Sequence, residues 1–179
     1  YPLDASPPEL SAGDWFTAPG ANVALGKSYR LKPRPSYSYC TDPDDETQLT
    51  DGVYTSGYFW TQKTTVGWSR ALPVIITVDL GEIEAVAGAS FNTAAGVAGV
   101  AWPFTVMVLV SDDGREWYEG GELVRETIRS APPKKEGYGV HRFAAGGWKT
   151  RARYVRFMVG QAPYCFVDEV EVYGGDPGW

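Results

Sequence analysis

Short apolar stretches predict β-strands along most of the chain. Residues 154–159 and 166–173 alternate apolar and polar side chains, which is typical of half-buried antiparallel strands. The other predicted strands are apolar runs at residues 74–80, 86–92, 104–111 and 139–143. Helical periodicity is almost absent. Strands at this spacing, separated by turns that contain Gly and Pro, predict an all-β domain, an antiparallel β-sandwich of the jelly-roll type.

Both ends of the chain have the composition of connecting segments. Residues 1–20 are Pro-rich and aperiodic, which predicts a lead-in peptide or linker, and residues 175–179 are turn-forming and are expected to lead to a further module. The predicted domain is therefore 21–174. Two long segments, 27–58 and 92–103, do not fit short hairpins, and we expect them to be functional loops on a rigid sandwich.

Composition excludes several classes of function. The chain has 16 Lys and Arg against 22 Asp and Glu, with no basic cluster, which argues against nucleic acid as a partner. Its apolar runs, such as that at 74–78, are far too short to span a bilayer. A single His excludes catalysis by a metal with two His ligands. Because no nucleophile motif or glycosidase carboxylate pair stands out, the chain is predicted not to be an enzyme.

The two cysteines bear on the compartment. Cys40 and Cys165 could form one disulfide or be two unrelated buried thiols, and the disulfide is the favoured interpretation. The low Lys content and the many Tyr and Trp residues also favour a secreted protein, or one in the periplasm or at the cell surface. No signal peptide is visible at residue 1, as expected either for a mature secreted fragment or for an excised piece of a longer protein.

Six short motifs occur in an order that resembles a known family. They lie at residues 22–27, 49–52, 76–81, 110–117, 152–156 and 167–172. Together they resemble the discoidin, or coagulation factor 5/8 type C, domain and its relatives, the family 32 carbohydrate-binding modules. The resemblance implies a galactose-binding-domain-like jelly roll, appended to a secreted enzyme or surface protein, with Trp60 and Trp117 at the family's core positions.

The resemblance also implies a structural calcium ion held by a loop and the last strand. Calcium takes six to eight oxygen ligands, including backbone carbonyls. The ligands carried over are the Gln48 carbonyl, the Asp51 carboxylate, an oxygen of Thr55 or Ser56, the Asp168 carbonyl and Glu169. The alternative is that Asp51 caps a turn and Glu169 is a satisfied charge. The acidic run at 42–46 lacks the spacing of an EF-hand and predicts a solvated turn.

Aromatic residues in the predicted loops are candidates for sugar binding. A pyranose stacks on an aromatic ring while directed polar groups bind its hydroxyls. The candidates are Tyr37, Tyr39, Trp68, Arg70, Trp102 and Tyr164. Each ring could instead be packing, and His141 is interpreted as structural. Residues 92–99 lack the Arg of galactose-binding relatives, so the sugar stays open.

These patterns predict a monomeric, non-catalytic carbohydrate-binding module that targets an attached enzyme to a polysaccharide or glycan. The alternative is a discoidin-type adhesion domain that binds membrane lipid or protein. Lipid-binding relatives present apolar spikes beside basic residues. Here the acidic run at 42–46 flanks the aromatic loops and the net charge is −6, which disfavours a membrane.

Overall fold

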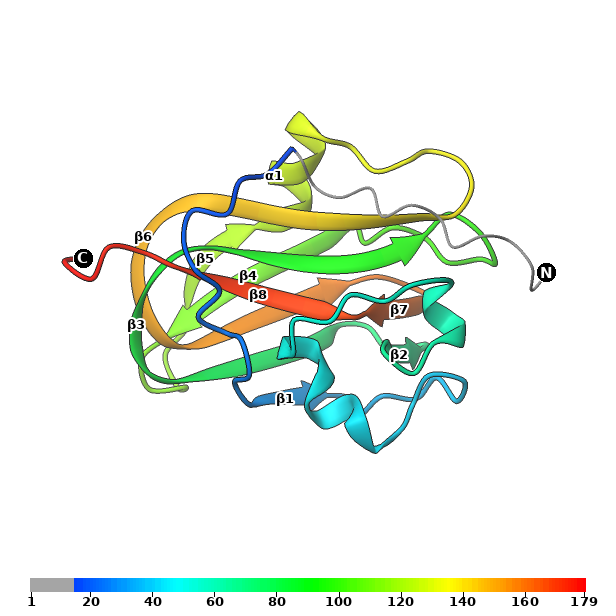
Figure 1. Ribbon diagram of the computed structural model, residues 1–179, viewed down its shortest axis with the longest axis horizontal. Helices are drawn as coiled ribbons and strands as arrows, with labels where there is room; N and C mark the ends of the chain where they lie inside the picture. Colours follow the sequence, from blue (N-terminus) through cyan, green and yellow to red (C-terminus); the bar gives the residue numbers. More distant parts are fainter. Residues whose placement is uncertain (1–14) are drawn as a thin grey trace.

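The computed structural model describes residues 15–179 as a two-layered antiparallel β-sandwich, and it confirms the predicted fold class (Figure 1). Most of the predicted lead-in, residues 1–20, lies outside the described residues. The strands are β1 (Tyr29–Lys32), β2 (Val66–Ser69), β3 (Val74–Ala95), β4 (Thr105–Ser111), β5 (Tyr118–Glu122), β6 (Gly139–Gly160), β7 (Tyr164–Val167) and β8 (Glu169–Gly174). One helix, α1 (Leu123–Ser130), and short 3-10 turns η1 (Pro43–Glu46), η2 (Gln48–Thr50) and η3 (Phe59–Thr61) complete it.

Two strands of 22 residues each, β3 and β6, form a bent ribbon that belongs to both layers. They pair from Val74 with Val159 to Ala95 with Gly139, and register shifts after Asp79 mark the bend (Figure 1). The first half of β3 also pairs with β1, and its second half pairs with β8. We call this pair the β3–β6 ribbon. The sequence predicted two strands within each of its members, whereas each is one continuous strand.

Glycine allows the ribbon to bend and close. Gly81, at the bend of β3, has a φ of 90°, a backbone conformation that other residues rarely adopt. At Gly88 a Cβ atom would lie 2.3 Å from the carbonyl oxygen of Ala145 on β6. Any side chain there would push the two strands apart, so glycine is required for the pairing to continue beyond the bend.

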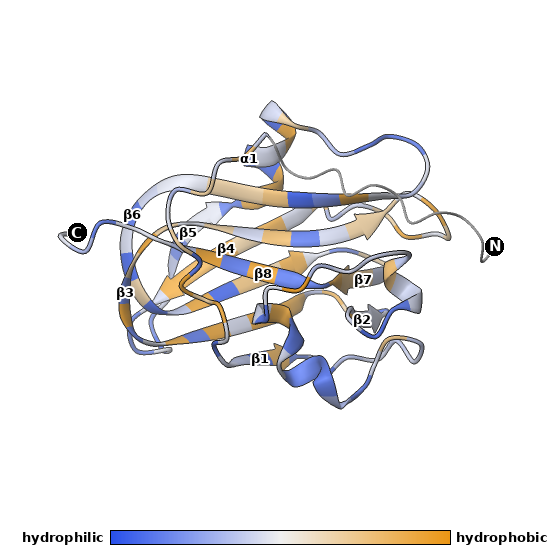
Figure 2. Cartoon of the chain, in the orientation of Figure 1, coloured by the Kyte–Doolittle hydropathy of each residue, from blue (hydrophilic) through white to orange (hydrophobic). Residues whose placement is uncertain are grey.

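The core lies between the layers, and strand alternation explains which side chains enter it. Val155, Phe157 and Val159 of β6 are fully buried, while Tyr154, Arg156 and Met158 between them face outward, as the sequence predicted. The same alternation of apolar and polar positions is visible along the strands in Figure 2. The outer face of this layer therefore carries polar and charged residues.

Helix α1 was not predicted. Its eight residues are too few to show clear periodicity, although Glu122 caps the first turn by accepting a hydrogen bond from the Val124 backbone N–H at 3.3 Å. Leu123 and Thr127 are buried against the sheet, and the Ala144 N–H of β6 donates to the Thr127 hydroxyl at 2.8 Å. In residues 15–179 no helix has the length and apolar character needed to cross a membrane.

Candidate functional site

The small β2–β7 sheet holds three loops together at one end of the sandwich. Ser69 of β2 pairs with Tyr164 of β7. The backbone N–H groups of Ser36 and Tyr37 both donate to the Gly67 carbonyl at 3.0 Å, which fixes the long loop after β1 to β2. In the same way, the Arg70 N–H donates to the Pro163 carbonyl at 2.8 Å. Loops that are distant in sequence thus share one rigid support.

Three of the predicted ligand residues meet here, and we call them the tyrosine rim: Tyr37, Tyr39 and Tyr164. The ring centroid of Tyr37 lies 5.8 Å from that of Tyr39 and 5.8 Å from that of Tyr164. Tyr37 also packs edge-on against Phe166 at 4.8 Å, which supports the rim from below. Tyr39 is 72% exposed, so one aromatic face is open to solvent. Their binding of a ligand stays a prediction.

Arg70 adds a cation next to the tyrosine rim. It follows β2 directly, is exposed and has a φ of 57°. Its backbone bond to Pro163 places it one residue from Tyr164. An exposed guanidinium can donate hydrogen bonds to sugar hydroxyls or to a carboxylate, and the binding of a ligand by Arg70 stays a prediction.

An aromatic floor continues from the tyrosine rim, and the sequence analysis did not select it. Trp60 packs 5.7 Å from Phe166 and 5.3 Å from Tyr138, and Tyr58 lies 4.6 Å from Tyr138. The Tyr138 hydroxyl donates to the Gly57 carbonyl at 2.8 Å, and burial raises the pKa of this phenol. The run of aromatic residues at 58–60 was the available signal, but Trp60 was assigned to the core.

The prediction of Trp68 as a ligand platform is wrong. Its ring is 0% exposed within the core, and its indole Nε1 donates to the Pro33 carbonyl at 2.9 Å. Trp102 is half-buried, with Nε1 donating to the Lys134 carbonyl at 3.0 Å and its ring 5.9 Å from that of His141. Trp102 therefore holds the loop before β6 in place, and any contact with ligand stays a prediction.

The predicted disulfide is not formed, because Cys40 and Cys165 are both free and buried. The Cys40 thiol lies 3.4 Å from the Phe59 carbonyl, to which it donates, whereas Cys165 sits opposite Trp68 in the main core. Burial raises the pKa of the Cys40 thiol to about 12. The backbone bonds of the β2–β7 sheet, rather than a covalent link, fix the loops that carry the tyrosine rim.

The predicted calcium loop does lie against the last strand. Glu169, only 1% exposed, accepts the Gly52 N–H with both carboxylate oxygens at 3.2 Å. Burial is the main reason why the pKa of Glu169 is raised to about 9, and neighbouring carboxylates, first among them Asp51, contribute to the same rise. A buried carboxylate with no basic side chain within ion-pair distance in residues 15–179 fits the requirement of an oxygen-liganded cation.

Several side chains at the other predicted ligand positions are used within the protein, whereas the ligands predicted at Gln48 and Asp168 are their backbone carbonyls. The Asp168 carboxylate accepts the Thr55 N–H at 2.7 Å and the Asn92 side-chain amide at 2.9 Å, so only its carbonyl would serve. The Thr55 hydroxyl bonds to Thr64, Ser56 is exposed, and the Gln48 amide donates to Asp45. Within the described chain no three His, Cys, Asp or Glu side chains are grouped for a metal. A cation here would therefore depend on backbone carbonyls.

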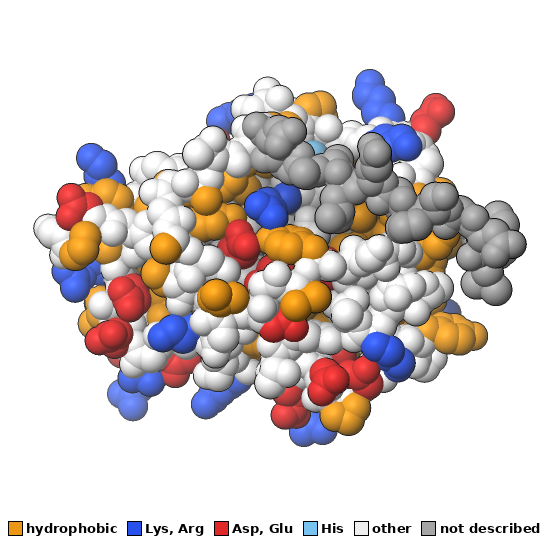
Figure 3. Space-filling model, in the orientation of Figure 1, with side chains coloured by type: hydrophobic (Ala, Val, Ile, Leu, Met, Phe, Trp, Pro, Cys, Tyr) orange, Lys and Arg blue, Asp and Glu red, His pale blue; other side chains and the backbone are white. Residues whose placement is uncertain are grey.

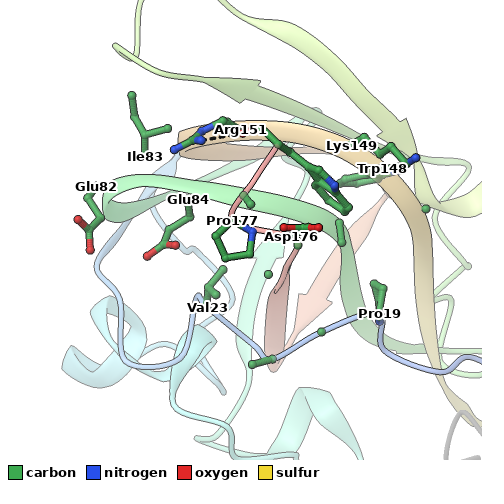
Figure 4. Close-up of a pocket in the computed structure, with 18 residues that line it drawn as sticks. Pro19, Val23, Glu82, Ile83, Glu84, Trp148, Lys149, Arg151, Asp176 and Pro177 are labelled. Atoms are coloured by element: carbon green, nitrogen blue, oxygen red, sulfur yellow. Dashed lines mark hydrogen bonds between the residues drawn. The ribbon is translucent and has the colours of Figure 1, made fainter.

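A separate hollow of about 850 Å³ lies where the bend of the β3–β6 ribbon meets the C-terminal segment (Figure 4). Its walls carry mixed charges, among them Glu84 and Arg151, and the Arg151 guanidinium donates to the Trp179 carbonyl at 2.6 Å. Two tryptophans line it. The Trp148 ring packs against Gly121 and the Trp179 ring against Gly175, so each has one face covered by backbone. No residue predicted from the sequence lies there.

Comparison with known proteins gives a fold but no close relative. No family model and no curated protein matches the chain. Among solved structures, it is similar to a CBM32 module of Clostridium perfringens (TM-score 0.54, 15% identity, 87% of this chain and 100% of that chain). It is also similar to a chitosan-binding module of Paenibacillus sp. IK-5 (0.51, 22%, 86% and 99%) and a fucose-binding module of Streptococcus pneumoniae (0.53, 16%, 89% and 99%). The chain therefore has the discoidin-like fold of the family 32 carbohydrate-binding modules.

Within this discoidin-like fold the two predicted core tryptophans lie in different places. Trp60 belongs to the aromatic floor and is half-buried against Phe166. Trp117 is half-buried on the outer face of the sheet, where the Arg156 guanidinium carbon lies 3.7 Å from its ring centroid. Trp117 therefore covers the outside of the sheet and does not fill the space between the layers.

Proposed function

We propose that this chain is a non-catalytic glycan-binding module whose ligand rests on the tyrosine rim. One observation carries the proposal: Tyr37, Tyr39 and Tyr164 converge from two separate segments, in ring contact and on a rigid support, with Tyr39 open to solvent. The Arg70 backbone is bonded to Pro163, which precedes Tyr164 in the chain, and we include its exposed guanidinium in the proposal as a donor of hydrogen bonds. Rings and a directed polar group at one place are what a pyranose requires.

The construction of the tyrosine rim favours binding without rearrangement. Phe166 supports two of the rings, and backbone hydrogen bonds to Gly67 fix the loop that carries Tyr37 and Tyr39. Groups already ordered lose less conformational entropy on binding. The contact area of a few rings is still small, so affinity for one oligosaccharide should be about 10 µM to 1 mM.

The comparisons support the general class of ligand. Proteins of this fold include a chitosan-binding module and a fucose-binding module, each of which spans almost the same length as this chain. Those ligands belong to those proteins, so the sugar recognised here stays open. We include in the proposal that the module is monomeric, acts outside the cytoplasm, and directs an attached enzyme to a polysaccharide or glycan.

We also propose that a structural calcium ion joins the loop at Asp51 to the start of β8. The buried Glu169 carboxylate and the adjacent Asp51 would supply charged oxygens, with backbone carbonyls of the same loop completing the set. The ion would stabilise the fold and would take no part in binding the glycan.

The test is affinity electrophoresis of the full chain through a panel of neutral and charged polysaccharides, followed by titration of the best ligand. Tyr39→Ala and Tyr164→Ala should each weaken binding about five-fold, since an aromatic contact contributes about 1 kcal/mol. Tyr118→Ala is the matched control, because Tyr118 is 63% exposed on β5. We expect this control to bind normally.

Two outcomes would contradict the proposal. Equal loss in the Tyr118→Ala control would show that the tyrosine rim has no special part in binding. Sedimentation with anionic liposomes, combined with no retardation by any glycan, would favour a membrane adhesion domain. On the face that Figure 3 shows, basic and acidic side chains are interspersed, so this face offers no uniformly basic surface to anionic headgroups.

A further inference from the structure

A second recessed surface lies on the outer face of the layer formed by β1, β3, β6 and β4. This groove has a volume of about 790 Å³ and shares no lining residue with the tyrosine rim. Strand pairing aligns three residues of the groove across the sheet, since Arg30 lies opposite Thr77 and Thr77 lies opposite Arg156. Directly opposed residues on neighbouring strands share one face. These three side chains therefore form a row across the outer face of the sheet, which we call the cation groove.

Arg156 is held rigidly at the centre of the cation groove. Its guanidinium carbon lies 3.7 Å from the Trp117 ring centroid, and its Nε donates to the Thr77 hydroxyl at 3.0 Å. A guanidinium has five N–H donors, so most of them remain for a ligand. Partial burial lowers the pKa of Arg156, because removing water from the charged guanidinium costs free energy. No carboxylate in residues 15–179 is within ion-pair distance to offset this desolvation cost. A bound anion would offset it.

The two acidic residues of the groove accept hydrogen bonds from other groups of the protein. The Asp79 carboxylate accepts two hydrogen bonds from Arg153, at 2.9 and 3.1 Å. The Asp113 carboxylate accepts the backbone N–H groups of Arg115 and Glu116 at 2.8 and 3.0 Å. These bonds lower the pKa of both carboxyl groups, so both are ionised at neutral pH, and neither lies within ion-pair distance of Arg30, Lys32, Arg115 or Arg156.

Four cations line the groove without an ion pair to any described residue: Arg30, Lys32, Arg115 and Arg156. Such a concentration is notable in a chain whose net charge is −6. Arg30 acts on Asp79 only at longer range, as a minor contribution to its lowered pKa. The groove therefore presents positive charge within an acidic protein, and its complement is a ligand with negative charge.

We propose that the cation groove is a second carbohydrate site, and that it takes an anionic glycan chain through carboxylate or sulfate groups. Arg30 and Arg156 lie two strands apart, which is about 10 Å, so the groove matches a chain with charges repeated at intervals of that order. The Thr77 hydroxyl and the backbone lie between them. The Trp117 ring is covered by Arg156, so recognition depends on charge and hydrogen bonds rather than on ring stacking.

Nucleic acid is a poorer match for this surface. Phosphates are closely spaced along a nucleic acid, and binding neutralises many of them with an extended basic face. Here the four cations are confined to one groove and the rest of the chain is acidic overall. The remaining acidic surface would repel a polyphosphate beyond the groove.

The test compares matched polymers and matched variants of the full chain by affinity electrophoresis at low salt. The polymers are polygalacturonate against its methyl-esterified form, and dextran sulfate against dextran, which separates carboxylate from sulfate recognition. The groove variant is Arg30→Gln with Arg156→Gln. The control is Arg125→Gln with Arg129→Gln, two exposed arginines of α1 whose loss changes the net charge equally.

We expect at least one anionic polymer to bind and its neutral counterpart to bind at least ten-fold more weakly, because charge-assisted hydrogen bonds are lost. The groove variant should lose at least ten-fold in affinity for the anionic polymer, and the α1 control less than three-fold. Urea unfolding of each variant checks that the fold is intact. The single variant Arg30→Gln, at an exposed position on β1, gives a second measure of how much the groove contributes to binding.

Several results would overturn the inference. Equal loss in the α1 control would mean attraction by net charge alone. Loss of anionic binding in Tyr39→Ala would place that ligand on the tyrosine rim. Tighter binding to duplex DNA or to anionic vesicles, lost in the groove variant, would assign the groove to another ligand class. If the chain binds neutral glycans but neither anionic polymer, the proposal of a second site is refuted and the proposal for the tyrosine rim stays intact.

Discussion

Replacing Trp68 separates a buried structural ring from a ligand-binding ring. The ring is fully buried, and its Nε1 donates to the Pro33 carbonyl at 2.9 Å. Trp68→Phe removes that hydrogen bond, which contributes about 1 kcal/mol to stability. The loss is not larger because Pro33 is exposed, so water can donate to its carbonyl in place of the indole. The smaller ring leaves part of the site empty at a cost of about 1–2 kcal/mol. The free energy of unfolding should fall by about 2–3 kcal/mol.

Urea unfolding followed by circular dichroism measures this loss. With a slope of about 2 kcal/mol per molar urea, the midpoint should fall by about 1–1.5 M. Glycan affinity should stay within two-fold, because the folded state remains dominant without denaturant. Tyr39→Ala should show the reverse pattern, with an unchanged midpoint and weakened binding, since its ring is 72% exposed.

Trp179→Phe is the control, because Trp179 is half-buried and its indole nitrogen donates to no atom of residues 15–179. Its unfolding midpoint should shift by less than about 0.3 M. An unchanged midpoint in Trp68→Phe together with lost glycan binding would refute the reasoning. That result would require the ring to face the ligand.

Three further predictions concern pH, calcium and redox state. Burial lowers the pKa of His141, so stability should be complete above about pH 6.5 and fall as the pH drops below it, because the unfolded state takes up the proton first. His141→Gln should remove this part of the pH dependence of urea unfolding, and an unchanged slope would contradict it. Calcium at about 100 times its Kd should raise Tm by about 5–10 °C, reversibly with a chelator, and Glu169→Gln should abolish the shift. Because both cysteines are free and buried, dithiothreitol should leave Tm unchanged, and Cys40 and Cys165 should react with a thiol reagent only on unfolding. A fall in Tm on reduction would show that they form a disulfide.

The strand pattern could be predicted because it depends on local alternation, but the continuity of the strands could not. Residues 74–80 and 86–92 were predicted as two strands, since Gly81 and the charged residues after it interrupt the apolar pattern. In the structure pairing with β6 resumes after the bend, which is a tertiary contact. Helix α1 is too short for its periodicity to be distinguished from chance.

The candidate site was predicted in part. Tyr37, Tyr39 and Tyr164 were selected as aromatic residues of predicted loops, and the β2–β7 backbone bonds that bring them together join segments distant in sequence. Burial of Trp68 depends on how a strand of four residues is packed, and alternation over four residues is too short to specify it. The cation groove joins residues from four separate segments, so no local pattern could indicate it.

The β3–β6 ribbon has a consequence for the lifetime of the folded chain. Its pairing joins residue 74 to residue 159, so the chain must close a long loop before these contacts form, and folding should be slow. Both layers share the same two strands, so neither can detach while the other stays intact. Unfolding should therefore be a single step with a high barrier. Slow unfolding of this kind protects a protein from proteolysis where no chaperone can refold it.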